Sequence, residues 1–317
     1  NKLNIICMEE MLMKTLYFIT GSQDLYGEET LAQAAKDSKE MAAYLNEQLC
    51  GIAGVVFQPV VRNSSEALDI CTKASSDKNC VGVIMWMHTF SPAKMWINAL
   101  KALSKPMLHL HTQYNERLPY DSIDMDFMNL NQSAHGDGEF GFICTRLGIK
   151  REVVSGYYKH ADVIERVRHF AQAAVAVDFG RGMRVAMFGN NMRDVAVTDG
   201  DRVESEIKYG WNVNYYGIGD LCDIISGITD EEIDAKMAEY TEKYAMNTDN
   251  LAAVREQAKY EAALEKFLAR ENISAFTDTF QDLHGLSQLP GIAAQNIMAK
   301  GVGFGPEGDY KTAALAA

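Results

Sequence analysis

The sequence predicts an α/β protein of two Rossmann-like domains, each with a mainly parallel sheet covered by helices. Short apolar runs alternate with amphipathic segments from residue 14 onward, and the alternation breaks at the charged, glycine-rich stretch 178–182 before it restarts. The chain has 317 residues, a length that suits two domains better than one core. Strands that alternate with helices are joined by crossover connections, so neighbouring strands run parallel and helices cover both faces of the sheet.

The first domain is predicted to contain five strands. The run Val-Gly-Val-Ile-Met-Trp at 81–86 is apolar without interruption, which is typical of a strand buried on both faces. Similar runs predict the other strands at 15–20, 55–61, 106–111 and 153–157. Helical spacing of apolar residues, capping hydroxyls and an early proline indicate the intervening helices. These helices are expected at 30–49, from Ser64 onward, after Pro92 and at 162–175.

The second domain repeats the alternation on a smaller scale. Its strands are predicted at 184–189, 211–216 and 274–280. Its helices are predicted at 203–209, from Thr229 onward, at 250–270 and at 292–300. Thr229 followed by Glu232 has the spacing of a capping box. The expected organisation is therefore a tail at 1–12 outside the fold, a first domain at 13–180 and a second at 181–317.

Composition and charge exclude several classes of function. The net charge of −13 disfavours nucleic acid and anionic membranes as partners, because phosphate binding needs clustered Lys and Arg. No stretch approaches the 18 uninterrupted apolar residues of a membrane span, and Glu9 and Glu10 interrupt the N-terminus where a signal peptide would be apolar. The six cysteines form no CxxC pair, which favours reduced, buried thiols in a cytoplasmic protein.

Polar segments follow several predicted strands. In an open parallel sheet, ligands bind beyond the carboxyl ends of the strands. The amides and hydroxyls of the loop at 21–27 and of the segment 124–136 are the groups that a polyhydroxylated ligand needs. His88, His109 and His111 could together form a metal site, although nothing else in their segments favours this over structural histidines.

The last polar segment, 301–312, is rich in glycine and contains one acidic residue of interest. Pro306 removes an amide donor that a phosphate loop would use, and Glu307 brings a negative charge to the place of the phosphate. A carboxylate in such a loop suits a metal ligand or a general base. The alternative is a solvated loop glutamate.

Six segments, in order along residues 14–315, closely resemble the L-arabinose isomerase family. They are GSQDLYGEETL at 21–31, HTFSPAKMWIN at 88–98, DSIDMDFMNLNQSAHG at 121–136, FGNNMRDVAVTDGD at 188–201, DLHGLSQLPG at 282–291 and EGDYKTAAL at 307–315. The resemblance implies the fold of the fucose and arabinose isomerases. It also implies an aldose–ketose isomerase that interconverts L-arabinose and L-ribulose, or D-galactose and D-tagatose. Such enzymes use a divalent metal, usually Mn2+, and an enediol intermediate.

The resemblance also implies roles for individual residues. Glu307 matches a glutamate that binds the metal and acts as acid or base. The matches that line the sugar pocket are Gln23, Leu25, Met192 and Phe280. Gln132 and His135 match residues that reach the pocket of a neighbouring subunit, which makes a homohexamer part of the expected site.

The sequence departs from the family in one large respect. The family's metal is held by two glutamates and two histidines, and three of these four lie beyond the motif that ends at Leu315. A C-terminal β-rich domain is also missing from the 317 residues. We therefore expect this chain alone to be inactive. The alternatives are a non-catalytic sugar-binding or assembly module and an L-fucose isomerase-like enzyme.

Overall fold

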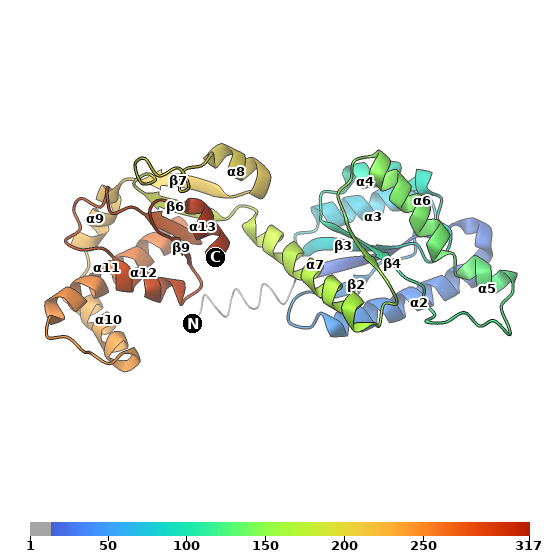
Figure 1. Cartoon of the computed structure of the whole chain (residues 1–317), viewed down its shortest axis with the longest axis horizontal. Helices are drawn as coiled ribbons and strands as arrows, with labels where there is room; N and C mark the ends of the chain where they lie inside the picture. Colours follow the sequence, from blue (N-terminus) through green and yellow to red (C-terminus); the bar gives the residue numbers. More distant parts are fainter. Residues whose placement is uncertain (1–13) are drawn as a thin grey trace. The chain divides into compact units, whose positions relative to one another are not determined.

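The computed structural model describes residues 14–317, so the predicted tail at 1–12 lies outside the described residues. The described chain divides into two compact units, one ending at Asp178 and the other beginning at Phe179 (Figure 1). Each unit has its own parallel sheet flanked by helices, as the sequence predicts for an α/β fold of two Rossmann-like domains.

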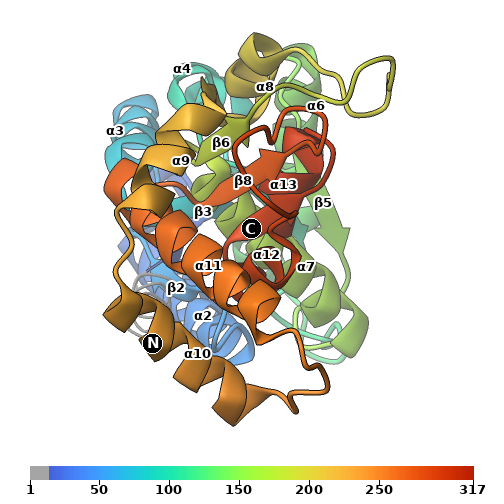
Figure 2. The same ribbon diagram turned by 90° about the vertical axis from the view of Figure 1, so that its left-hand side faces the viewer.

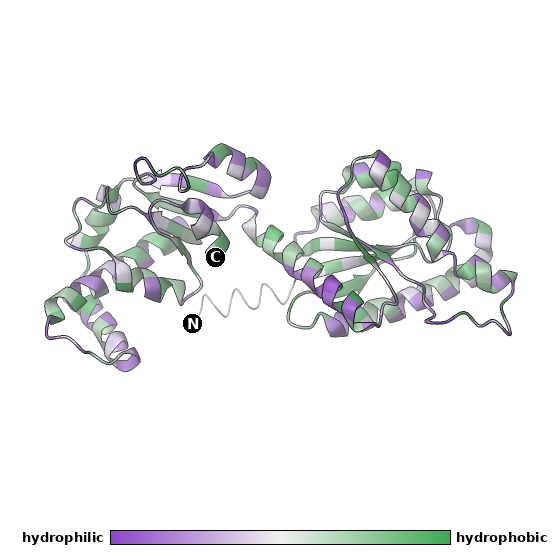
Figure 3. Ribbon diagram, viewed as in Figure 1, coloured by the Kyte–Doolittle hydropathy of each residue, from purple (hydrophilic) through white to green (hydrophobic). Residues whose placement is uncertain are grey.

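The first unit is built on a five-stranded sheet with the order β2-β1-β3-β4-β5, in which all neighbours are parallel. The strands are β1 (Thr15–Thr20), β2 (Gly54–Phe57), β3 (Cys80–Trp86), β4 (Met107–His111) and β5 (Glu152–Ser155). Every residue of β3 is buried, and Figure 3 shows this strand mostly in the green of hydrophobic residues. The uninterrupted apolar run therefore does mark a strand covered on both faces.

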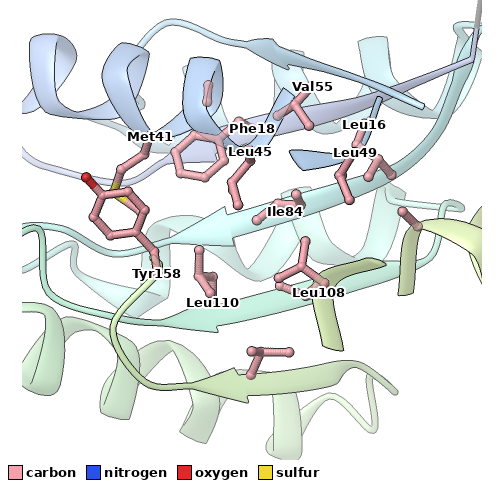
Figure 4. Close-up of a cluster of buried hydrophobic side chains, with 14 of the residues drawn as sticks. Leu16, Phe18, Met41, Leu45, Leu49, Val55, Ile84, Leu108, Leu110 and Tyr158 are labelled. Atoms are coloured by element: carbon pink, nitrogen blue, oxygen red, sulfur yellow. The ribbon is translucent and has the colours of Figure 1, made fainter. Parts of the chain in front are cut away.

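Helices cover both faces of this sheet. On one face, α2 (Gly27–Gln48) and α7 (Ala161–Gly180) pack against side chains such as Phe18, Ile84 and Leu110 (Figure 4). The other face is covered by α3 (Ser64–Ser76), η2 (Ala93–Trp96), α4 (Ile97–Ala102) and α6 (Ser133–Arg146). The remaining elements of this unit are η1 (Asp24–Tyr26) and α5 (Met125–Leu130).

The second unit has a four-stranded parallel sheet with the order β7-β6-β8-β9. Its strands are β6 (Arg184–Phe188), β7 (Asn212–Tyr216), β8 (Ala275–Asp278) and β9 (Gly303–Gly305). One face packs against α9 (Ile218–Ser226), α11 (Leu251–Glu271) and α12 (Gly291–Met298), which Figure 2 shows side by side. The other face packs against α13 (Tyr310–Ala316). The remaining helices are α8 (Arg202–Tyr209) and α10 (Asp230–Lys243).

The N-terminal cap of α10 agrees with the sequence prediction, and that of α3 differs from it. The capping box at Thr229 forms as predicted, with Thr229 and Glu232 each accepting a hydrogen bond from the other's backbone N–H. At α3, however, the cap is Asn63, whose side-chain oxygen accepts from the backbone N–H groups of Ser65 and Glu66. An Asn side chain caps as well as Ser, so the helix begins at Ser64 without using the serine hydroxyls.

Several elements are not among those predicted. Helices α5 and α6 both begin in the amide-rich segment 124–136, α9 follows β7, and the glycine-rich segment 301–312 contains β9 and the start of α13. The strands predicted at 55–61 and 274–280 end earlier, at Phe57 and Asp278. Within residues 14–317, no helix has both the length and the apolar character needed to cross a membrane.

Candidate functional site

Both sheets reverse their strand order at one point. The order changes direction between β1 and β3 in the first unit and between β6 and β8 in the second. At such a point the connections from adjacent strands leave in opposite directions, and the carboxyl ends of the strands border a crevice where ligands bind. Gln23 and Leu25 follow β1, Met192 follows β6 and Phe280 follows β8, so these predicted residues lie beside the switch points.

In the second unit, Phe280 and Glu307 line one cavity of about 350 Å³. Its walls also include Asp278 at the end of β8, Phe304 in β9 and residues of α12. The cavity lies at the carboxyl ends of β8 and β9, and its volume falls in the range of small-molecule sites. The structure thus brings together two predicted site residues that are 27 positions apart in the sequence.

The backbone of Glu307 is held in an uncommon conformation. Its φ is +65°, in the left-handed region that non-glycine residues rarely adopt, which costs roughly 1–2 kcal/mol. The Glu307 carbonyl accepts a hydrogen bond of 3.0 Å from the Met192 N–H. The next residue, Gly308, has φ +80°, and a Cβ there would lie 2.3 Å from the Cα of Asn191. Glu307 is therefore fixed against the loop that carries Met192.

The loops after β6 and β8 are also tied to each other. The Asp282 carboxylate accepts hydrogen bonds from the Asn190 N–H and from the Arg193 guanidinium, both at 3.1 Å. The Arg193 N–H donates to the Gln281 side-chain oxygen at 2.7 Å. Met192 lies between these anchored residues, so its position is set by contacts on either side as well as by Glu307.

Asp278 is a residue of this cavity that the sequence did not single out. Its carboxylate forms no hydrogen bond or ion pair within the described part of the chain, and burial raises its pKa from 3.8 to about 6. The signal in the sequence was a charged residue at the end of an apolar run, Ala-Phe-Thr-Asp, where a strand end meets the ligand side of the sheet.

In the first unit, the predicted residues after β1 meet those at the start of α6. The Gln23 side chain donates to the Phe90 carbonyl at 3.1 Å, and the His135 ring stacks on the Phe90 ring with centroids 4.4 Å apart. The Gln132 amide donates to the Tyr26 hydroxyl at 3.3 Å. Gln23, Gln132 and His135 therefore gather around Phe90 and Tyr26, two aromatic residues not singled out from the sequence.

Leu25 differs from its neighbours because its side chain faces solvent in this chain. It is 82% exposed, although it belongs to the same short segment as Gln23 and Tyr26. A large apolar side chain with that exposure contributes nothing to the core of its own unit.

The combination of His88, His109 and His111 as metal ligands is wrong. His88 is buried on the α2 face of the sheet, where its ring stacks on Trp86 and lies 2.9 Å from an Asp37 carboxylate oxygen. His109 and His111 lie on the α6 face. Side chains on opposite faces of a sheet point away from each other, so His88 cannot share an ion with His109 and His111. Asp137 of α6 joins His109 and His111 instead, with one ligand atom from each residue within 4.8 Å of the others.

The cavity at Glu307 does not by itself make a complete metal site. Carboxylate oxygens suit Mn2+, and Glu307 and Asp278 both line the cavity. Within residues 14–317, however, the group at His109 is the one place where three possible ligands come together. A divalent cation needs several ligands at fixed geometry, so Glu307 and Asp278 alone do not complete a metal site in this cavity.

Comparison with known sequences identifies similar proteins along the whole described chain. The profile of the L-arabinose isomerase N-terminal domain matches residues 10–181, and the profile of the central domain matches residues 184–317. Three L-arabinose isomerases are similar over most of the chain. Those of Shouchella clausii, Geobacillus thermodenitrificans and Thermotoga petrophila are 51%, 50% and 48% identical over 94%, 94% and 97% of it. The chain spans 61–62% of the length of these relatives.

Proposed function

The chain belongs to the L-arabinose isomerase family, and we propose that it forms the sugar-binding part and one catalytic carboxylate of an aldose–ketose isomerase. The proposed reaction interconverts L-arabinose and L-ribulose, with D-galactose and D-tagatose as further substrates. The observation that supports it is the cavity of about 350 Å³ at the end of the second sheet, which Glu307 and Phe280 both line.

Glu307 is proposed to move the proton in this reaction. Aldose–ketose isomerisation transfers a proton between adjacent carbons through an enediol, which requires a base within hydrogen-bonding reach of the substrate carbon. Glu307 faces the cavity from a loop locked by Gly308 and by the Met192 N–H. Because the backbone of Glu307 is fixed, its carboxylate can be held at the short distance from the substrate that proton transfer needs.

The other predicted residues are proposed to hold the sugar. Phe280 offers an apolar ring and Met192 a flexible apolar side chain, while Gln23 offers amide groups for hydroxyls. The exposed Leu25 is also proposed to contact the sugar. Gln132 and His135 are proposed to reach the pocket of a neighbouring subunit in a homohexamer.

A metal cofactor and a cytoplasmic location are also proposed. Mn2+ is proposed to bind Glu307, and it would polarise the sugar oxygens when bound. The cysteines within the described residues, Cys50, Cys71, Cys80, Cys144 and Cys222, are free thiols. Free thiols persist in a reducing compartment, which supports a cytoplasmic location.

A chimera tests the proposed function. We would join the chain to the portion of a relative that it does not match and measure L-ribulose formation with Mn2+. The chimera should be active, and Glu307→Gln should lower kcat by about 10²–10⁴-fold. Glu204→Gln, a change in an exposed ion pair with Lys208, should leave the rate unchanged. An active Glu307→Gln chimera would remove Glu307 from the mechanism.

The 317-residue chain alone is the second arm of this experiment. We expect no detectable turnover with Mn2+, because the described residues present no three-ligand group at Glu307. The same observation favours a second candidate, a module that binds sugar without converting it. Tight, metal-independent binding of L-arabinose in a calorimetric titration, together with an inactive chimera, would support the module and contradict the isomerase.

A further inference from the structure

A buried carboxylate flanked by two imidazoles lies in the first unit. Asp137 of α6 is 2.8 Å from His109 Nε2 and 4.0 Å from His111 Nε2, and both histidines project from the same face of β4. One possible ligand atom of each residue lies within 4.8 Å of the other two. We propose that His109, His111 and Asp137 bind a divalent transition-metal ion such as Zn2+ or Co2+.

The charge at Asp137 supports a cation at this place. Asp137 is only 1% exposed, and a buried charge is unfavourable unless it is paired or bound to a metal. Among the described residues, no Lys or Arg nitrogen lies within 4.0 Å of its carboxylate oxygens, and its ion-pair partners are the two histidines.

The carboxylate is oriented in the way that metal ligands usually are. Its Oδ2 accepts a hydrogen bond of 2.5 Å from the Ser133 hydroxyl, and its Oδ1 accepts one of 3.2 Å from the Met87 N–H. Outer hydrogen bonds of this kind fix the direction of a metal-binding carboxylate. The carboxylate is therefore held in place without a metal, and the cation would join a prepared group.

His109 and His111 can join Asp137 as metal ligands after a proton shift and a small ring rotation. His109 Nε2 faces Asp137, whereas its buried Nδ1 has no hydrogen-bond partner. Shifting the proton from Nε2 to Nδ1 would free Nε2 to bind a metal. His111 is one-third exposed at its side chain and makes no side-chain hydrogen bond within residues 14–317, so its ring can rotate toward the ion. Two His and one carboxylate are ligands that Zn2+ commonly takes.

The proposed site has an open side. A cavity of about 350 Å³ is lined by Asp137 and His111, with Gln113, Arg117 and Tyr157 among its other residues. His109 is not part of that lining. Three protein ligands beside a cavity leave a fourth position for water or for an oxygen of a small ligand, as in open zinc sites.

Co2+ titration of the 317-residue chain tests the proposal, because its visible d–d absorption reports the ligands directly. Wild-type protein should bind one equivalent with bands typical of nitrogen and oxygen ligands, and Zn2+ should displace it. His111→Gln should weaken Co2+ binding on the order of 100-fold, since even the loss of an outer partner costs 10–100-fold. His169→Gln, which alters an exposed histidine on α7, is the matched control and should leave the titration unchanged.

Two further measurements keep the result interpretable. Zn2+ should raise the Tm of wild-type protein but not that of His111→Gln. The circular dichroism of His111→Gln should match that of wild type, because the His111 side chain is one-third exposed. Glu307→Gln should bind Co2+ like wild type, so this site can hold or fail independently of the proposed isomerase. Equal Co2+ affinity in His111→Gln and wild type, or no Co2+ absorption in wild type, would overturn the proposal.

Discussion

The Asp278 carboxylate is partly buried and has no hydrogen-bond or ion-pair partner within the described residues. Burial raises its pKa from 3.8 to about 6, so folding favours the neutral form. The stability that this group contributes is complete below about pH 4 and is lost as the pH rises through about 6. At pH 7 the ionised carboxylate therefore opposes folding.

Asp278→Asn should remove this penalty. The amide has the same shape and stays neutral, so the free energy of unfolding should rise by roughly 1–3 kcal/mol at pH 7. The gain should vanish near pH 3, where the Asp278 carboxyl is neutral in both the folded and the unfolded state. Urea unfolding at the two pH values measures the difference. Asp249→Asn, at an exposed position, should have little effect at either pH. A gain of equal size at both pH values would show that charge is not the cause.

The two acidic residues of the second-unit cavity differ in how well the sequence could predict them. Glu307 could be singled out because a carboxylate in a glycine-rich, proline-containing loop is an unusual pattern, and its motif resembles a known family. Asp278 had only the weaker signal of a charged residue at the end of an apolar run, because its place in the cavity depends on β8 ending at that residue and on the packing of α12. The positive φ of Glu307 arises from contacts with the Met192 loop, which no local pattern encodes.

At the scale of elements, one buried carboxylate joins three helices of the second unit. Glu261 of α11 is 1% exposed and accepts hydrogen bonds from Tyr240 of α10 at 2.6 Å and from Asn296 of α12 and Lys300, both at 2.8 Å. Burial opposes its ionisation, but these hydrogen bonds hold the pKa of Glu261 below its ordinary value. The network is thus part of the packing of α10, α11 and α12.

Glu261→Ala should destabilise the second unit by about 3–5 kcal/mol at pH 7, because it leaves buried donors and a lysine without their acceptor. A depressed pKa contributes stability above the ordinary pKa and loses it as the pH falls through the depressed value, so the difference should shrink in acid. Urea unfolding at pH 7 and pH 3 measures it. Glu204→Ala, in the exposed pair with Lys208, should cost at most about 0.5 kcal/mol. Equal effects of the two changes would contradict a buried network.

Periodic elements could be predicted from the sequence and irregular ones could not. The long helices α2, α7 and α11 and the apolar strand β3 have strong patterns, and their predicted positions agree to within a few residues. Helix α6 contains glycines at 136, 138 and 141, which lower helix propensity, and it is held by packing of Phe140 and Cys144 against the sheet. Strand β9, Gly-Phe-Gly, is a strand only because β8 pairs with it.

At the scale of the whole molecule, each unit has a hydrophobic core of its own. The buried clusters of the first unit draw on residues between 16 and 174, and those of the second draw on residues between 183 and 314. Both cores contain strand side chains from two faces of a sheet and the helices that cover them. A core that is complete within one unit can support folding without the other.

A piece that ends at residue 182 should therefore fold by itself. It keeps the whole of α7, the ion pair of 2.7 Å between Lys14 and Asp178 and the hydrogen bond of 2.9 Å from the Trp86 indole to the Thr112 carbonyl. Its amide NMR spectrum should be dispersed and should overlay that of the full chain except near the cut, and it should unfold cooperatively in urea. The same spectrum should show the shifts of His109 and His111 on addition of Zn2+, because all three proposed ligands lie in this piece. A collapsed, poorly dispersed spectrum would mean that the first core needs the second unit, and the two cores would then have to be treated as one folding unit.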